Sequence, residues 1–360
     1  MTTTTFARRT SAPPVARFAI GDDRAMLKAA ADITRDLNAP RPLVYWADFL
    51  ASAALGYAAL AGAIVAGSPG WTIALGVVAA LALYRGMSFI HELTHVKHAA
   101  LPGFRFGYNL LIGVPMLVPS FMYEGVHNLH HARTRYGTAE DPEYLPLALM
   151  KPWTLPVFVV VAALAPLALI VRYAVLAPLS ALFPSLRRIV VARYSALAIN
   201  PDFRRRMPEG AFRRQWNRIE AACAAWAIAL VALVASGTLS PRAFAIMLAV
   251  ASGVATVNQV RTLAAHLWEN DGEPMTVTAQ YLDSVNVPPP ALLPALWAPV
   301  GLRYHALHHL LPGVPYHALG EAHRRLTAAL APDSPYNKAN YTALSQLIGK
   351  IGRSTLARRG

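Results

Sequence analysis

Long apolar runs separated by short polar segments dominate the first quarter of the chain. No charged residue lies between Asp48 and Arg85, and residues 67–70 ("GSPG") divide this run near its middle. A membrane-spanning helix needs about 20 mostly apolar residues. The pattern therefore predicts two spanning helices, about residues 45–66 and 71–90, joined by a tight turn.

Three further apolar regions follow. Residues 221–236 and 243–260 are free of charge and separated by "GTLSPR", which predicts a second hairpin. Residues 106–123 contain glycines and prolines, so they either dip into the membrane or cover a buried cavity. Residues 152–186 are long enough to span, but prolines interrupt them, and whether they cross the membrane or lie on it stays open.

The distribution of charged residues predicts how the chain is oriented in the membrane. The segment 187–218 carries nine arginines and only two acids, so the positive-inside rule places it in the cytoplasm. The basic N-terminal arm and the region after about residue 260 then share that side. The segments between 104 and 186 must cross an even number of times or not at all, and re-entrant or interfacial helices are favoured there.

The composition agrees with a membrane protein and excludes other classes. Only 14% of the residues are charged, against about 25% in soluble domains. A net charge of +14 could indicate nucleic-acid binding, but the arginines cluster beside apolar runs, so no nucleic-acid partner is expected. The single cysteine, Cys223, excludes a disulfide framework, a zinc ribbon and an iron–sulfur cluster.

The predicted fold is all-α and integral to the membrane, with four transmembrane helices in two hairpins, re-entrant or interfacial helices, and a cytoplasmic cap. Three regions are expected: a cytoplasmic N-terminal arm and amphipathic helix (1–40), a membrane domain (41–335) and a C-terminal tail (336–360).

The histidines carry the strongest functional signal. The chain has 12 of them, none in the first 90 residues and none between His131 and His266. Most fall in "HELTH" (91–95), "HNLHH" (127–131) and "HALHH" (305–309). Their spacings of three and four residues put the imidazoles of each motif on one helical face. The motifs flank the cytoplasmic ends of the spans, so one pocket, a histidine-lined cap below the membrane, can collect them.

So many buried imidazoles would need many partners, which metal ions supply at once. Imidazole suits zinc, copper, iron and nickel, and nine ligands exceed one four-coordinate zinc site. Two iron ions fit best, because two ferrous ions can together reduce dioxygen. "HELTH" also matches the HExxH pattern of zinc proteases, but that interpretation leaves "HNLHH" and "HALHH" unexplained.

These three motifs, in this order and around two hydrophobic hairpins, resemble the integral-membrane fatty acid desaturase and hydroxylase superfamily, and "GLRYHALHHLLPGVPYHAL" looks especially like bacterial fatty acid desaturases. The resemblance covers about residues 45–330. It implies a diiron centre with dioxygen as co-substrate and one further histidine, here His266; in some members an asparagine, here replaced by Thr262, contributes through water. The implied ligands are His91, His95, His127, His130, His131, His266, His305, His308 and His309.

Other residues are candidates by their position beside these motifs. His98, Glu92, Glu124, Asn258 and Asp283 could orient the ligands; Asp141 and Glu143 either do the same or form a solvated loop. A last group could contact substrate or an electron donor: Arg133, Arg261 and Arg303.

The resemblance implies an oxidoreductase of lipid acyl chains in a membrane, here taken as the bacterial inner membrane. A dioxygen-dependent acyl desaturase is favoured, with a hydroxylase, a ketolase or a 1-alkene-forming decarboxylase as alternatives. No haem, flavin or iron–sulfur motif is present in the sequence, so a separate donor such as a ferredoxin with its reductase is expected. A metal transporter or sensor is a distant alternative, because the four clearest spans carry no charged residue between Asp48 and Arg85, within 221–236 or within 243–260.

Overall fold

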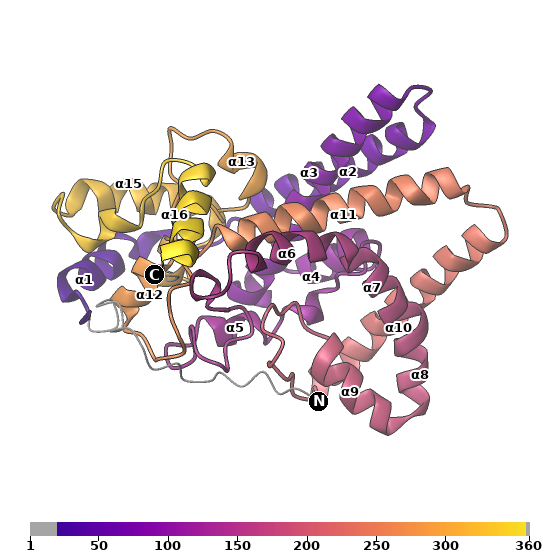
Figure 1. The fold of residues 1–360 in the computed structure, drawn as a ribbon, viewed down its shortest axis with the longest axis horizontal. Coiled ribbons are helices and arrows are strands. Elements are labelled where there is room, and N and C mark those ends of the chain that lie inside the picture. The colour runs from indigo at the N-terminus through magenta and orange to yellow at the C-terminus, as the bar shows by residue number, and fades with distance from the viewer. Residues whose placement is uncertain (1–19, 358–360) are drawn as a thin grey trace.

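The computed structural model describes residues 20–357, and within that range the protein is all-helical, as the sequence predicts. Two long antiparallel hairpins project from a compact body of short helices (Figure 1). The first pairs α2 (Pro42–Val65) with α3 (Pro69–His95), and the second pairs α10 (Gly210–Ala235) with α11 (Pro241–Leu263).

Local sequence explains the turn of the first hairpin. Pro69 occupies the first position of α3, where a missing N–H costs nothing, and the Ser68 side chain caps the backbone N–H of Trp71. Arg242 at the start of α11 donates to the carbonyl oxygens of Ile64 and Ala66. The two hairpins are therefore joined at the ends that point away from the body.

The outer faces of these helices are apolar and exposed. Leu55, Val65, Trp71 and Ile73 each leave more than half of their surface uncovered. Contiguous exposed apolar surface of this kind marks an interaction site or a membrane-facing surface. Together with the length of the helices, it shows an integral membrane protein.

Among residues 20–357, five helical segments, rather than the predicted four, are long and apolar enough to cross a membrane. The additional one is Thr154–Leu182, a continuous but irregular helix. The histidines at the ends of α3 and α11 lie together, so both ends share one face, and α10 begins on that face too.

The irregular helix takes its form from its prolines and from changes in helical type. It consists of α6 (Thr154–Val160), η6 (Val161–Leu164), α7 (Ala165–Val171), η7 (Arg172–Leu176) and α8 (Ala177–Leu182), and α9 (Pro184–Tyr194) follows it.

The segment predicted to dip into the membrane or cover a cavity, residues 106–123, forms short helices that pack inside the body. Tyr108, Ile112 and Phe121 are fully buried. This region and its neighbours comprise η2 (His98–Ala100), α4 (Phe104–Tyr108), η3 (Asn109–Gly113), η4 (Ser120–Met122), α5 (His127–His130) and η5 (Leu147–Leu149).

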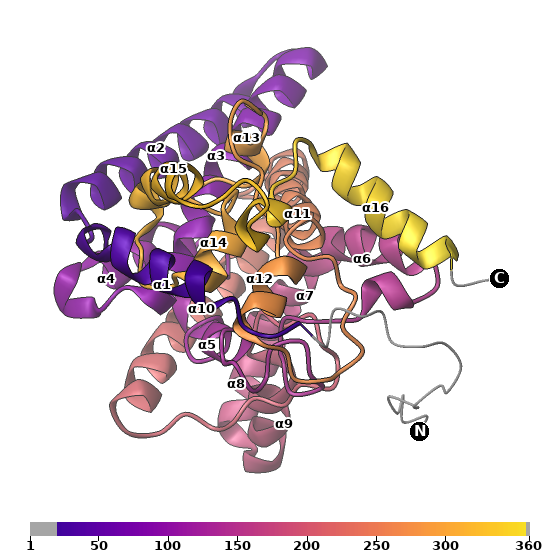
Figure 2. The same cartoon turned by 90° about the vertical axis from the view of Figure 1, so that its left-hand side faces the viewer.

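A cap of short helices closes the body at the histidine end (Figure 2). The expected amphipathic helix at 1–40 is present as α1 and η1, while residues 1–19 of the arm lie outside the described range. The expected C-terminal tail contains α16, whose Leu347 and Ile351 are buried in the core. The cap consists of α1 (Arg24–Ile33), η1 (Arg35–Leu37), α12 (Val277–Asp283), α13 (Pro294–Trp297), α14 (His305–Leu310), η8 (Tyr316–Ala318), α15 (Leu319–Ala329), η9 (Pro335–Ala339) and α16 (Leu344–Ala357).

Candidate metal centre

Nine histidines, the set implied by the sequence resemblance, form two adjacent clusters where α3, α5, α14 and the end of α11 meet. In each cluster every residue offers a ligand atom within 4.8 Å of the others. The first cluster is His91, His95, His127, His131 and His308, and the second is His130, His266, His305 and His309.

Helical geometry explains how one motif serves both clusters. Successive residues of a helix are separated by about 100°, so positions i+3 and i+4 point about 100° apart. In "HNLHH" the i and i+4 residues join the first cluster and His130, at i+3, joins the second. In "HALHH" the assignment is reversed: His308, at i+3, joins the first cluster. Each motif therefore bridges the two clusters.

The Nε2 atoms converge as metal ligands do. The Nε2–Nε2 distance is 2.9 Å between His127 and His131 and 3.0 Å between His266 and His305. Two ligand atoms bound at a right angle to one ion, each about 2.1 Å from it, would be about 3.0 Å apart. The donor sets and their spacing thus fit one metal ion in each cluster.

The protonation state of the clustered histidines also favours metal binding. Burial, reinforced by neighbouring histidines, lowers the pKa of His127, His131, His308 and His309 well below the ordinary value. Neutral rings direct lone pairs, and not positive charges, toward the cluster centre. Converging lone pairs repel one another unless a cation lies between them.

Two carboxylates on the loop after α5 orient the "HNLHH" rings. Asp141 is fully buried, and its oxygens lie 2.9 and 3.0 Å from Nδ1 of His130. Glu143 lies 2.8 Å from Nδ1 of His127, which the Tyr123 hydroxyl also contacts at 2.8 Å. A carboxylate that accepts from Nδ1–H leaves Nε2 free to bind a metal.

The environment of these carboxylates is consistent with that role. Burial raises the pKa of Glu143 to about 7. For His130, burial disfavours the charged ring, but the attraction of Asp141 and Glu143 outweighs it and the pKa is raised. A metal ion at Nε2 would displace that proton and keep both acids ionised.

His266 is oriented through a tyrosine. The Tyr136 hydroxyl lies 2.8 Å from Nδ1 of His266 and donates to Oδ2 of Asp283 at 2.8 Å. Tyr144 donates to the same oxygen at 2.9 Å. All of these groups are buried, and burial raises the pKa of Asp283 to about 6.

Glu92 lies beside the first motif. Its Oε1 is 3.6 Å from Nδ1 of His91, and its Oε2 accepts from the Tyr45 hydroxyl at 2.5 Å and from the backbone N–H of Tyr316 at 3.2 Å. Both ring nitrogens of His91 are buried without a hydrogen-bond partner in the described part of the chain. A metal ion would provide the partner that Nε2 lacks.

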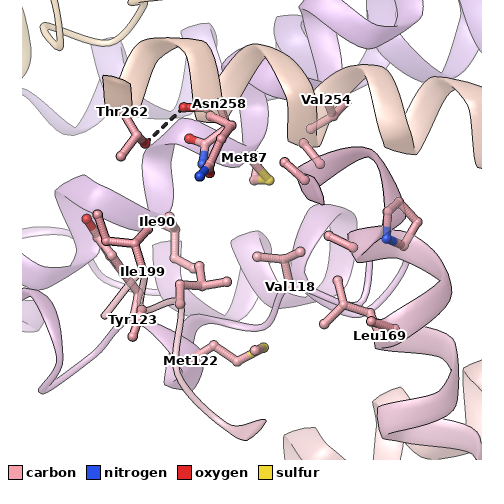
Figure 3. Close-up of a pocket in the computed structure, with 18 of the residues that line it drawn as sticks. Met87, Ile90, Val118, Met122, Tyr123, Leu169, Ile199, Val254, Asn258 and Thr262 are labelled. Carbon is pink, nitrogen blue, oxygen red and sulfur yellow. Dashed lines mark hydrogen bonds between the residues drawn. The ribbon is translucent and has the colours of Figure 1, made fainter. Parts of the chain in front are cut away.

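A cavity of about 710 Å³ adjoins the first cluster and is lined by His91, Tyr123 and Glu143 at that end. Figure 3 shows the polar residues Asn258 and Thr262 of α11 facing the same space as Ile90 and Tyr123. Toward the other end the labelled residues Val118, Leu169 and Val254 are apolar. The size lies in the range of about 300–1,000 Å³ usual for small-molecule sites.

The sequence model described as "Fatty acid desaturase" matches residues 68–340, which include all nine clustered histidines. The chain belongs to the fatty acid desaturase family. It is also 49% identical over 331 residues to the ceramide hydroxylase of Caulobacter vibrioides (strain NA1000 / CB15N), covering 92% of this chain and 94% of the relative. No solved structure matches it.

In this desaturase-family protein, several further candidates lie away from the clusters. His98 contacts Arg105 at 2.9 Å, and Glu124 forms an ion pair with the same arginine at 2.7 Å. Arg133 is exposed and pairs with Asp22, and Arg303 donates to the backbone oxygens of Val287 and Ala291. By contrast, Asn258 and Arg261 line the cavity, and Asp283 is linked to His266 through Tyr136.

Three tyrosines at the site were not predicted from the sequence: Tyr123, Tyr136 and Tyr144. Tyr123 lies four residues before His127, which is one helical turn, so its spacing could have indicated a contact. Tyr136 and Tyr144 lie in an irregular loop, where sequence spacing does not determine which side chains meet.

Proposed function

We propose that this protein is a membrane hydroxylase that inserts one oxygen atom from dioxygen into a C–H bond of a ceramide. The observation that carries the proposal is the 49% identity to a ceramide hydroxylase along nearly the whole of both chains. The cavity, whose apolar walls lead to His91 of the first histidine cluster, supports a lipid substrate. The sequence alone favoured desaturation, and the relative supports the alternative of hydroxylation.

Two iron ions fit the donor sets and the family. When bound, they would supply the reduction of dioxygen, in which two electrons and two protons accompany the insertion of one oxygen atom and the release of the other as water. The first ion would be held by the cluster containing His127, and the second by the cluster containing His130.

The protein's own groups would perform the remaining tasks. Asp141 and Glu143 hold the rings of His130 and His127 with Nε2 directed inward. The apolar walls exclude water and align the lipid chain. Further proposals are the cytoplasmic orientation of the cap, from the arginine-rich segment 187–218, and a separate electron donor such as a ferredoxin with its reductase.

The experiment is lipid analysis of a host that contains ceramide and expresses the full chain. We expect hydroxylated ceramide with the wild type and none with His130→Ala, while His98→Ala, a matched change outside both clusters, retains the product. Newly unsaturated lipid without a hydroxylated product would instead support the desaturase activity for which the family is named. Equal product from His130→Ala and the wild type would refute the assignment of the centre.

A further inference from the structure

The C-terminal end of α11 presents polar side chains to the cavity, although α11 is a membrane helix. Asn258, Arg261 and Thr262 all line the cavity, and their spacing of three and four residues places them on one face. Polar and charged side chains inside membrane helices are costly and are usually functional. None of the three is among the clustered histidines.

These side chains have unused hydrogen-bonding capacity. The Thr262 hydroxyl donates to the backbone oxygen of Asn258 at 2.9 Å, so its own oxygen can still accept. Within residues 20–357, no side-chain hydrogen bond engages the Asn258 amide, and Nε of Arg261 is buried without a partner. Buried polar atoms normally have partners, and Nε of Arg261 lacks one, while the half-buried side chains of Asn258 and Thr262 open onto the cavity. This end of the cavity therefore indicates a polar ligand.

The polar end lies beside the candidate metal centre. Asn258, Arg261 and Thr262 line the same cavity as His91 of the first cluster and Glu143, which contacts His127. Thr262 lies four residues before His266 of the second cluster. Figure 3 shows Asn258 and Thr262 directed into the same space as Tyr123.

We infer that Asn258, Arg261 and Thr262 form a polar anchor for the amide and hydroxyl groups of the lipid, and so select ceramide and fix the carbon that reacts. This inference rests on the proposed function. A ceramide offers one carbonyl acceptor together with N–H and O–H donors. Arg261 can donate to the carbonyl oxygen, while the side-chain oxygens of Asn258 and Thr262 can accept from the N–H and hydroxyl groups.

The anchor also disfavours other lipids. A hydrocarbon chain without polar groups would leave the Asn258 amide and Nε of Arg261 unpaired. A free carboxylate would accept from Arg261 but would offer no donor to the side-chain oxygens of Asn258 and Thr262. Because the anchor adjoins the histidine clusters, the hydroxyl group is expected within a few carbon atoms of the amide and not in the middle of a chain.

The test compares a short-chain ceramide with its N-methylated analogue as ligands of the metal-free, full-length protein in detergent. We expect the wild type to prefer the ceramide. Asn258→Leu and the nearly isosteric Thr262→Val should each weaken ceramide binding by about threefold to tenfold, the value of one neutral hydrogen bond. Asn258→Leu, which removes the acceptor of the amide N–H, should also reduce the preference for ceramide. Val254→Ala, at the apolar end, should weaken both ligands equally.

Two further measurements distinguish the anchor from other roles. Iron content should stay at the wild-type level in both anchor variants, and loss of iron would assign these residues to the metal centre and overturn the inference. Tandem mass spectrometry of the wild-type product should place the hydroxyl near the amide, and a mid-chain hydroxyl would overturn it.

The possible failures are distinguishable. If the wild type neither binds nor oxidises ceramide, the proposed function fails and the anchor fails with it. If the wild type binds ceramide but Asn258→Leu, with an unchanged melting temperature, keeps the full preference, only the anchor is refuted.

Discussion

The contact between Asp141 and His130 provides a quantitative test of the metal centre. Asp141→Asn keeps the shape of the side chain but removes its charge. In the wild type, the two carboxylate oxygens of Asp141 accept from Nδ1 of His130 and from the backbone N–H groups of Gly137 and Glu143. An amide offers one acceptor oxygen where the carboxylate offers two. At least one of these N–H groups would face an NH₂ group.

The expected loss of metal affinity in Asp141→Asn follows from these contacts. A hydrogen bond to a charged group contributes about 1.5–3 kcal/mol, and loss of a carboxylate behind a metal-bound histidine costs about 10–100-fold in affinity. Because His130 belongs to the second cluster, Asp141→Asn should weaken one of two sites. Anaerobic titration with Fe²⁺ should show one binding event at the wild-type affinity and one weakened by that factor.

The control is Glu140→Gln, a neutralisation in the same loop. Glu140 is 73% exposed and reaches only Arg135, at 3.5 Å, so its removal should leave both binding events unchanged. Unaltered binding of two ions by Asp141→Asn, or an equal loss in Glu140→Gln, would refute the role given to Asp141.

Three other changes test different parts of the structure. Tyr136→Phe removes the hydroxyl that contacts Nδ1 of His266; we expect about 10-fold weaker binding of one metal ion by the same titration. Burial raises the pKa of the Glu143 carboxyl to about 7, so in the metal-free protein this carboxyl is protonated below about pH 7, and metal binding releases the proton. The metal affinity should therefore rise between pH 6 and pH 8, and it should rise less in Glu143→Gln. Arg172→Met leaves the buried carboxylate of Glu220 without one of its arginine partners; it should lower the free energy of unfolding by about 3–5 kcal/mol, seen as a lower melting temperature.

The hairpins could be predicted from the sequence because uncharged runs of sufficient length have few alternatives in a membrane protein. The predicted helices at 71–90 and 243–260 correspond to the longer α3 and α11, which carry polar residues at their ends. Residues 152–186 could not be resolved by the same reasoning, because length and hydropathy are equal for a segment that crosses and one that returns. The structure forms one irregular helix there, Thr154–Leu182, without determining which of the two it is.

Within the site, the resemblance to the desaturase and hydroxylase superfamily implied the nine histidines, and helical spacing placed the imidazoles of each motif on one face. Neither indicated how the histidines divide between two centres. The division depends on the relative placement of α5 and α14, which is a tertiary property. Asp141 could be interpreted from the sequence either as an orienting group or as a solvated loop residue, and the structure places it against His130. Tyr136 links His266 to Asp283, and these two residues lie 130 and 147 positions after it in the sequence. No local sequence pattern could indicate contacts over such separations.

The most direct test of the central claim is isotope labelling of the purified, iron-loaded protein with ceramide, a reducing system and ¹⁸O₂. We predict hydroxylated ceramide that carries one ¹⁸O atom, with no product from His130→Ala. Product without ¹⁸O, or an unsaturated lipid in place of a hydroxylated one, would contradict the assignment of this protein as a dioxygen-dependent ceramide hydroxylase.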